Sequence, residues 1–142
     1  MVLQIKINLQ KIKVPKTKRS QAPVSLRTVR DEIHYAKIKS KRTVHKPLLE
    51  EIRIKEWNNW ALIDNEFPYS SAFKVHHMLI PKRVVSNKDL SVVERFEMDE
   101  IMDELSDEYD CVLVNFKKKQ SITEHFHMHL LTYKDKRKEL KI

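Results

Sequence analysis

The chain has 142 residues, of which 41% are hydrophobic and one is cysteine. This length predicts a single domain with a modest core, and the lone cysteine excludes an internal disulfide bond. No apolar run approaches the roughly 20 residues of a membrane span. Since the N-terminus also lacks the apolar segment of a secretory signal, we expect a cytoplasmic protein with no membrane partner.

The formal net charge of +8 is concentrated at one end of the chain. Residues 1–60 carry 15 Lys and Arg against 5 Asp and Glu, a balance of +10, whereas residues 61–142 carry 13 against 15, a balance of −2. Such a basic segment suits nucleic acid or another phosphate-rich partner. A solvated basic face on ordinary elements is an equally weighted interpretation.

The first third of the chain predicts a strand followed by a helix. Apolar and polar residues alternate over residues 3–9, which is typical of a half-buried strand. A basic connector over 11–21 leads to a helix expected over 24–39, and 48–56 fits either a short helix or a strand that enters the next segment. We therefore expect residues 1–56 to form a basic N-terminal extension, a strand plus a helix, packed on the core.

Residues 57–142 predict the main domain, with strands on both sides of one long helix. The expected elements are strands over 57–63, 75–80, 111–115 and 125–131, a helix over 89–109, a loop over 116–123 and a charged tail over 134–142. This order predicts an α+β fold in which the long helix packs on an antiparallel β-sheet.

The long predicted helix is amphipathic. Its candidate N-caps are Ser86, Asn87 and Asp89. Helical spacing predicts an apolar stripe against the sheet made of Leu90, Val93, Phe96 or Glu97, Ile101 and Leu105. The acidic residues of the helix, Glu94 among them, are expected on its solvated outer face.

Three histidines occupy alternate positions of the last predicted strand. Because successive side chains of a strand point to opposite faces, His125, His127 and His129 should line one open surface. Phe126 and Met128 should then be buried behind the sheet. Three imidazoles on one wall can serve as nucleophile, orienter and proton donor.

Neutral imidazole is a competent nucleophile near pH 7, because its unperturbed pKa is about 6.5. Attack on a phosphate would form a phosphoramidate and divide one difficult displacement into two easier steps. His127 has a histidine partner on each side, so it is the expected nucleophile. As an alternative, three neutral histidines with tetrahedral geometry could bind zinc and leave a position open for water.

Two further segments precede the histidines in a matching order. Ala61–Pro68 and His76–Arg83 have the spacing of paired strands, and the second ends in an apolar-Pro-Lys segment. Together with His-x-His-x-His and the two apolar residues after it, they resemble the histidine-triad (HIT) superfamily of nucleotide hydrolases and transferases. The resemblance covers residues 57–133 and favours catalysis over a metal site, because it restores the context of the motif as well as the motif itself.

The resemblance implies a role for each histidine of the motif. The middle one, His127, would carry a transient nucleotidyl group while a backbone carbonyl near His125 holds its other ring nitrogen. His129 would contact the phosphate, and His125 would order the strand by packing and hydrogen bonding. His76 matches the additional active-site histidine of the family.

The resemblance also implies substrate contacts outside the triad. Asn115 corresponds to an asparagine that contacts phosphate, and Asp64 or Asn65 lies where relatives hold the ribose hydroxyls. Gln120 and Ser121 correspond to a Gln-Ser pair, displaced by one position, and this displacement weakens Ser121 as a donor to the leaving group.

A phosphate loop of the family is altered here. The chain contains no glycine, and the Gly-rich loop is replaced by Phe116 and the lysines of residues 117–119. Ammonium groups, Lys119 among them, would then replace the backbone amides that cradle phosphate, unless the lysines form only a solvated turn.

We therefore expect an enzyme that cleaves a nucleoside phosphoanhydride or phosphoramidate bond through a nucleotidyl-histidine intermediate and requires no cofactor. The alternative is a nucleotide- or RNA-binding protein with little turnover, in which the basic segment holds the partner. Because many relatives pair their sheets across a two-fold axis, the resemblance implies a homodimer. A basic segment that covers the edge strand would instead keep the chain monomeric.

Overall fold

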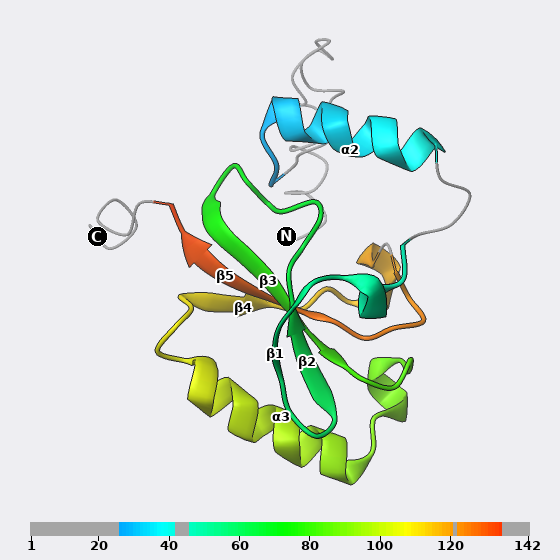
Figure 1. The fold of residues 1–142 in the computed structure, drawn as a ribbon, viewed down its shortest axis with the longest axis vertical. Coiled ribbons are helices and arrows are strands. Elements are labelled where there is room, and N and C mark those ends of the chain that lie inside the picture. Colours follow the sequence, from blue (N-terminus) through cyan, green and yellow to red (C-terminus); the bar gives the residue numbers. More distant parts are fainter. Residues whose placement is uncertain (1–25, 42–45, 121, 135–142) are drawn as a thin grey trace, which may run out of the picture.

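The computed structural model describes residues 26–41, 46–120 and 122–134 (Figure 1). The elements are α2 (Val29–Lys41), β1 (Arg53–Glu56), β2 (Trp60–Ile63), β3 (Phe73–Pro81), α3 (Val92–Leu105), β4 (Cys111–Leu113) and β5 (Met128–Tyr133), with short 3-10 turns at Leu48–Glu50, Asn87–Asp89 and Lys117–Lys119. The strand expected over 3–9 and the connector over 11–21 lie outside the described residues.

The five strands form one antiparallel sheet in the order β1-β2-β3-β5-β4. This arrangement confirms the predicted α+β class and the antiparallel sheet. β1 belongs to the segment assigned to the N-terminal extension, yet it pairs with β2 along the edge of the sheet. The sheet therefore begins at Arg53, before the expected boundary at residue 56.

The long helix and the sheet enclose the larger hydrophobic core. Its buried members come from β2, β3, α3 and the β5 region, and they are Trp60, Leu62, Leu79, Leu90, Ile101, Leu105, Phe126, Met128 and Leu130. The indole nitrogen of Trp60 donates a 2.9 Å hydrogen bond to the Glu94 carbonyl, which ties β2 to the helix. The helix thus packs on the sheet as predicted.

The helix begins later than expected, and its cap differs from the prediction. Ser91 is the N-cap: its hydroxyl accepts from the backbone N–H of Glu94 at 3.1 Å, while the Glu94 carboxylate accepts from the Ser91 N–H at 2.8 Å. These reciprocal bonds satisfy two backbone donors that the first turn leaves open. The caps predicted at Ser86, Asn87 and Asp89 are therefore wrong, because Asn87–Asp89 form a separate 3-10 turn.

The buried face of the helix also differs from the prediction. Val93 and Phe96 are 66% and 68% exposed, whereas Ile101 and Leu105 are buried and Met98 and Met102 pack against the same core. Glu94, expected on the solvated face, is only 3% exposed because it closes the cap and binds Arg83. At about 100° per residue, Val93 lies about 80° and Phe96 about 140° around the helix from Ile101, so neither shares its buried face.

The N-terminal helix contacts the sheet domain through a loop. α2 begins at Val29 instead of residue 24 and has no buried residue. The ring centroid of Tyr35 lies 4.8 Å from that of Phe67, and Ser71 donates its N–H to the Leu26 carbonyl at 2.8 Å. Figure 1 shows the sheet between α2 and α3. No helix in the described part of the chain is long and apolar enough to cross a membrane.

Candidate active site

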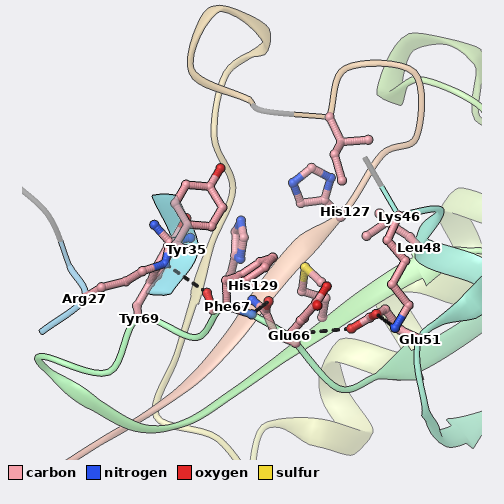
Figure 2. Close-up of a pocket in the computed structure, with 13 residues that line it drawn as sticks. Arg27, Tyr35, Lys46, Leu48, Glu51, Glu66, Phe67, Tyr69, His127 and His129 are labelled. Carbon is pink, nitrogen blue, oxygen red and sulfur yellow. Dashed lines mark hydrogen bonds and ion pairs between the residues drawn. The ribbon is translucent and has the colours of Figure 1, made fainter. Parts of the chain in front are cut away.

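A pocket opens on the sheet face opposite α3 (Figure 2). It encloses about 630 Å³ of empty space, a volume that includes its open mouth. The lining residues come from the α2 region, the loop before β3, the 3-10 turn after residue 47 and the β5 region: Arg27, Tyr35, Lys46, Leu48, Glu51, Asn65, Glu66, Phe67, Tyr69, Met78, Ile122, His127 and His129.

The three histidines alternate as predicted, but they do not line an open surface. Phe126 and Met128 lie in the core beneath α3, while His127 and His129 face the pocket on the other side. His125, His127 and His129 are only 4–5% exposed. The expected open surface is therefore wrong, because other segments cover this face of the sheet. β5 itself begins at Met128, so the first two histidines lie on the segment that enters the strand.

Backbone carbonyls hold two of the histidines. The Nε2 of His125 lies 2.7 Å from the Pro81 carbonyl, so this ring links the start of β5 to the end of β3. The Nδ1 of His127 lies 3.0 Å from the His125 carbonyl. Because a carbonyl only accepts, Nδ1 of His127 carries the proton and Nε2 keeps its lone pair. Within the described residues, nothing bonds to that Nε2.

A second pair of histidines forms a directed chain of hydrogen bonds. The backbone N–H of Tyr69 donates to Nδ1 of His76 at 2.9 Å, which places the proton of a neutral His76 on Nε2. That Nε2 lies 2.7 Å from Nδ1 of His129. His129 then carries its proton on Nε2, a buried atom without a partner among the described residues. The chain therefore holds an unused N–H donor at the pocket.

The electrostatics keep these imidazoles neutral at pH 7. Burial, followed by the nearby His129 and Arg27, lowers the pKa of His76 to about 3. Burial also lowers the pKa of His129 to about 3, with His127 and Arg27 contributing. The pKa of His127 is lowered as well, chiefly by burial. A neutral ring is also what the hydrogen bonds of His76 require, because this ring both accepts and donates.

Aromatic side chains cover the histidine pair. The ring of Tyr69 lies 4.4 Å from that of His76 and 5.2 Å from that of His129, between centroids. The guanidinium carbon of Arg27 lies 5.3 Å from the Tyr69 centroid and 4.3 Å from that of Tyr35. Residues of the N-terminal extension thus form part of the wall.

The other end of the pocket combines apolar groups with an ion pair. Nζ of Lys46 lies 2.6 Å from a Glu51 carboxylate oxygen, and the second oxygen accepts from the backbone N–H of Glu66 at 3.1 Å. Leu48 and Met78 line the same region and belong to a small apolar cluster on this face. Figure 2 shows Lys46 and Glu51 at one side of His127 and Arg27 and Tyr69 at the other.

The structure brings together some of the predicted site residues. His127, His129 and Asn65 line the pocket, and His76 lies directly behind His129. The Asn65 amide nitrogen lies 3.2 Å from Nδ1 of His76, so it contacts this ring. His77 points the other way, with Nδ1 2.5 Å from the Tyr109 hydroxyl, because successive side chains of a strand alternate between its faces.

Other predicted residues do not line the pocket. Asp64 is exposed, and its carboxylate accepts from the backbone of Asn65. The Gln120 side-chain amide donates to the backbone carbonyl of Asn115 at 2.9 Å and so closes its own loop, and neither residue lines the pocket. Lys119 is exposed in a 3-10 turn, and Ser121 lies outside the described residues.

Several pocket residues were not predicted from the sequence. Arg27, Tyr35 and Tyr69 have no spacing motif, and they meet the histidines only because α2 docks on the loop before β3. The basic bias of the N-terminal segment was a general signal for Arg27 and Lys46, but it could not select either residue.

The described residues contain no group of three or more His, Cys, Asp or Glu side chains placed to hold a metal ion. Neither a search of protein-family models nor a search of curated proteins finds a match to this chain. Function must therefore be inferred from the geometry of the pocket.

Proposed function

We propose that this protein cleaves a nucleoside phosphoanhydride or phosphoramidate bond by covalent catalysis at His127, as a HIT-type hydrolase or transferase. One observation carries the proposal: the rings of His127 and His129 lie 5.2 Å apart between centroids, and among the described residues neither the Nε2 lone pair of the first nor the Nε2–H of the second has a partner. A nucleophile next to an orphan donor suits attack on phosphorus, where charge develops on the non-bridging oxygens.

In the first step, Nε2 of His127 attacks the α-phosphorus, a P–N bond forms, and the leaving group departs with the electron pair of its bond. His129 donates Nε2–H to a non-bridging oxygen. In the second step, water or another acceptor attacks the phosphorus and the P–N electron pair returns to His127. The His125 carbonyl supports the charge that the ring carries between the steps, because it binds Nδ1–H.

His76 and Tyr69 are positioning residues in this scheme. The Tyr69 backbone sets the tautomer of His76, and His76 in turn sets that of His129. If His76 could not donate, His129 would lose the constraint that leaves its proton on Nε2. We place the nucleoside at the end of the pocket lined by Leu48 and Met78, where apolar side chains can cover a base.

The proposal requires no cofactor and keeps the cytoplasm as the expected compartment. The predicted nucleic-acid contact of the basic segment stays a prediction, since residues 1–25 lie outside the described residues. The predicted homodimer also stays a prediction.

The test is hydrolysis of adenylated and guanylated anhydrides and amidates, with and without a chelator, by wild type, His127→Ala and His77→Ala. The His77 variant is the matched control, because that ring lies on the opposite side of β3 from His76. We expect turnover in wild type and the control and none in His127→Ala. Absence of turnover in wild type would favour a binding protein, and loss of turnover with chelator would favour a metal site.

A further inference from the structure

Arg27 is fixed against the histidine pair from several directions. Its guanidinium carbon stacks over Tyr35 and Tyr69, and Nε donates to the Phe67 carbonyl at 3.2 Å. Nη1 lies 3.6 Å from the Glu32 carboxylate. The side chain is 18% exposed. A cation held in this way loses little rotamer entropy when a ligand binds.

The charge of Arg27 acts on the reacting groups. The Arg27 guanidinium lies over one side of the Tyr69 ring, and this ring also packs against His76 and His129. Arg27 contributes to the lowered pKa of both rings, after burial and the neighbouring histidine. Its field therefore reaches the donor end of the hydrogen-bond chain.

The pocket has two different ends around His127 (Figure 2). One contains Leu48, Met78 and the Lys46–Glu51 ion pair, and the other contains Arg27 and the aromatic rings. In an in-line displacement, the leaving group departs opposite the attacking Nε2, whereas the nucleoside is attached through an equatorial oxygen and points in another direction. With the nucleoside at the apolar end, the leaving group lies at the Arg27 end.

The chemistry of that end discriminates between leaving groups. An amine must be protonated as it leaves, whereas a phosphate leaves as an anion that needs charge stabilisation instead of a proton. A guanidinium cannot act as the acid, because its pKa exceeds about 12, but it binds phosphate oxygens in a planar fork. The neutral histidines likewise offer N–H donors and no imidazolium.

Resting on the proposed function, we infer that Arg27, supplied by the N-terminal extension, binds an anionic leaving group and makes nucleoside phosphoanhydrides the preferred substrate class. The α-phosphorus bonds to Nε2 of His127 while its bond to the bridging oxygen breaks, and the electron pair leaves with the expelled phosphate. Water then attacks the adduct, the P–N pair returns to the ring, and the proton of the water passes to solvent.

The experiment compares a nucleoside 5′-diphosphate with the matching 5′-phosphoramidate, in adenosine and guanosine versions. The two substrates differ only in the leaving group, phosphate or ammonia, and they form the same adduct. Variants are Arg27→Met, which keeps the length of the side chain, Arg27→Lys, which keeps the charge, and Arg30→Met. Arg30 is the matched control, because it is an exposed arginine in the first turn of α2, three residues after Arg27.

We expect wild type to prefer the diphosphate. The ratio of kcat/KM for diphosphate to that for phosphoramidate should fall about 10- to 100-fold in Arg27→Met, the usual cost of losing a charged hydrogen bond. The loss should lie in adduct formation, since breakdown of the shared adduct no longer involves the leaving group. Arg27→Lys should lose less, and Arg30→Met should keep the wild-type ratio.

An unchanged ratio in Arg27→Met, or an equal loss with both substrates, would overturn the inference. Wild type that cleaves only the phosphoramidate would overturn it as well while the proposed function stands. Wild type that cleaves neither substrate and forms no adduct would overturn both. If Arg27→Met does not fold, Arg27→Lys decides, because a selective loss with diphosphate supports the inference and an unselective loss contradicts it.

Discussion

The two faces of the sheet differ in what they bury. The face beneath α3 buries large apolar side chains, with Trp60 and Leu130 fully inaccessible. The opposite face buries four imidazoles beneath a loop and the α2 region, and α2 itself has no buried residue. Apolar burial contributes stability at roughly 25 cal/mol per Å², whereas burying a polar ring costs free energy unless it is hydrogen-bonded.

This difference indicates a division of labour between the faces. The α3 face stabilises the sheet. The histidine face lowers the net stability, because it buries neutral rings and holds them in fixed tautomers. The clearest sign is Nε2 of His129, which has no partner in the described part of the chain, because a buried donor without an acceptor is costly and is expected at a functional site. Changes on the two faces should therefore have different consequences.

The largest effect is expected from His127→Ala. Removal of a nucleophile typically lowers kcat by about 10⁴-fold or more. The α3 face is untouched, so the protein should still unfold cooperatively. Steady-state kinetics and thermal unfolding on the same sample check both parts. Residual activity within about tenfold of wild type would show that another group is the nucleophile.

The reverse pattern is expected from Ile101→Ala. Ile101 is 2% exposed in the core beneath α3, so the cavity should lower the free energy of unfolding by about 2–5 kcal/mol. Activity per folded molecule should persist, because the pocket lies across the sheet. Urea denaturation measures the loss, and Val92→Ala, at an exposed position of the same helix, serves as the control. A loss of activity per folded molecule that, expressed as a free energy, is as large as the loss in the free energy of unfolding would contradict the division of labour between the two faces.

Acid should destabilise the histidine face. His76 and His129 have a pKa of about 3 when folded and about 6.5 when unfolded, so the unfolded chain binds more protons between these values. Their stability contribution is complete above pH 6.5 and falls as the pH drops towards 3, by up to about 1.4 kcal/mol per pH unit for each ring. Urea denaturation from pH 7.5 to 5 measures the slope, which His76→Gln should reduce. If the free energy of unfolding of His76→Gln depends on pH as steeply as that of wild type, groups other than His76 cause the pH dependence.

The smallest effect is expected from Glu94→Gln. Hydrogen bonds from Arg83, and then those of Ser91, hold the pKa of Glu94 at about 2. The amide oxygen of Gln can still accept from the backbone of Ser91, so only the ion pair is lost. Since the Arg83 side chain is 56% exposed, solvent screens the ion pair. We therefore expect the free energy of unfolding to fall by about 1 kcal/mol. Glu100→Gln, on the exposed side of α3, is the control. A fall of more than about 3 kcal/mol in the free energy of unfolding of Glu94→Gln would contradict this view of the cap.

The order of the elements and the alternation of the histidines could be predicted because both depend on local periodicity. His76 facing His129 across β3 and β5 also follows from two-residue alternation once the strands pair. The cap of α3 could also have been predicted from the sequence, because Ser91 and Glu94 have the three-residue spacing of a capping box. The apolar stripe was placed wrongly because Val93 and Phe96 do not share the helical face of Ile101, although both are apolar.

The burial of the histidines could not be predicted, because it depends on contacts between distant segments. Arg27 meets Phe67 across 40 residues of sequence, and Tyr69 reaches His76 by a turn of the loop. Nothing in the spacing of these residues encodes either contact. The one-position displacement of Gln120 from the family motif did indicate locally that its role differs. Its amide closes its own loop and does not face the pocket.

The central claim is that His127 becomes covalently attached to the nucleotide. The most direct test is rapid acid-free quenching of wild type with substrate, followed by mass spectrometry of the peptides under conditions that preserve P–N bonds. We predict a nucleotidyl group on His127 that is absent from His127→Ala and present in His77→Ala. An adduct on another residue, or turnover with no adduct at any time point, would contradict the account.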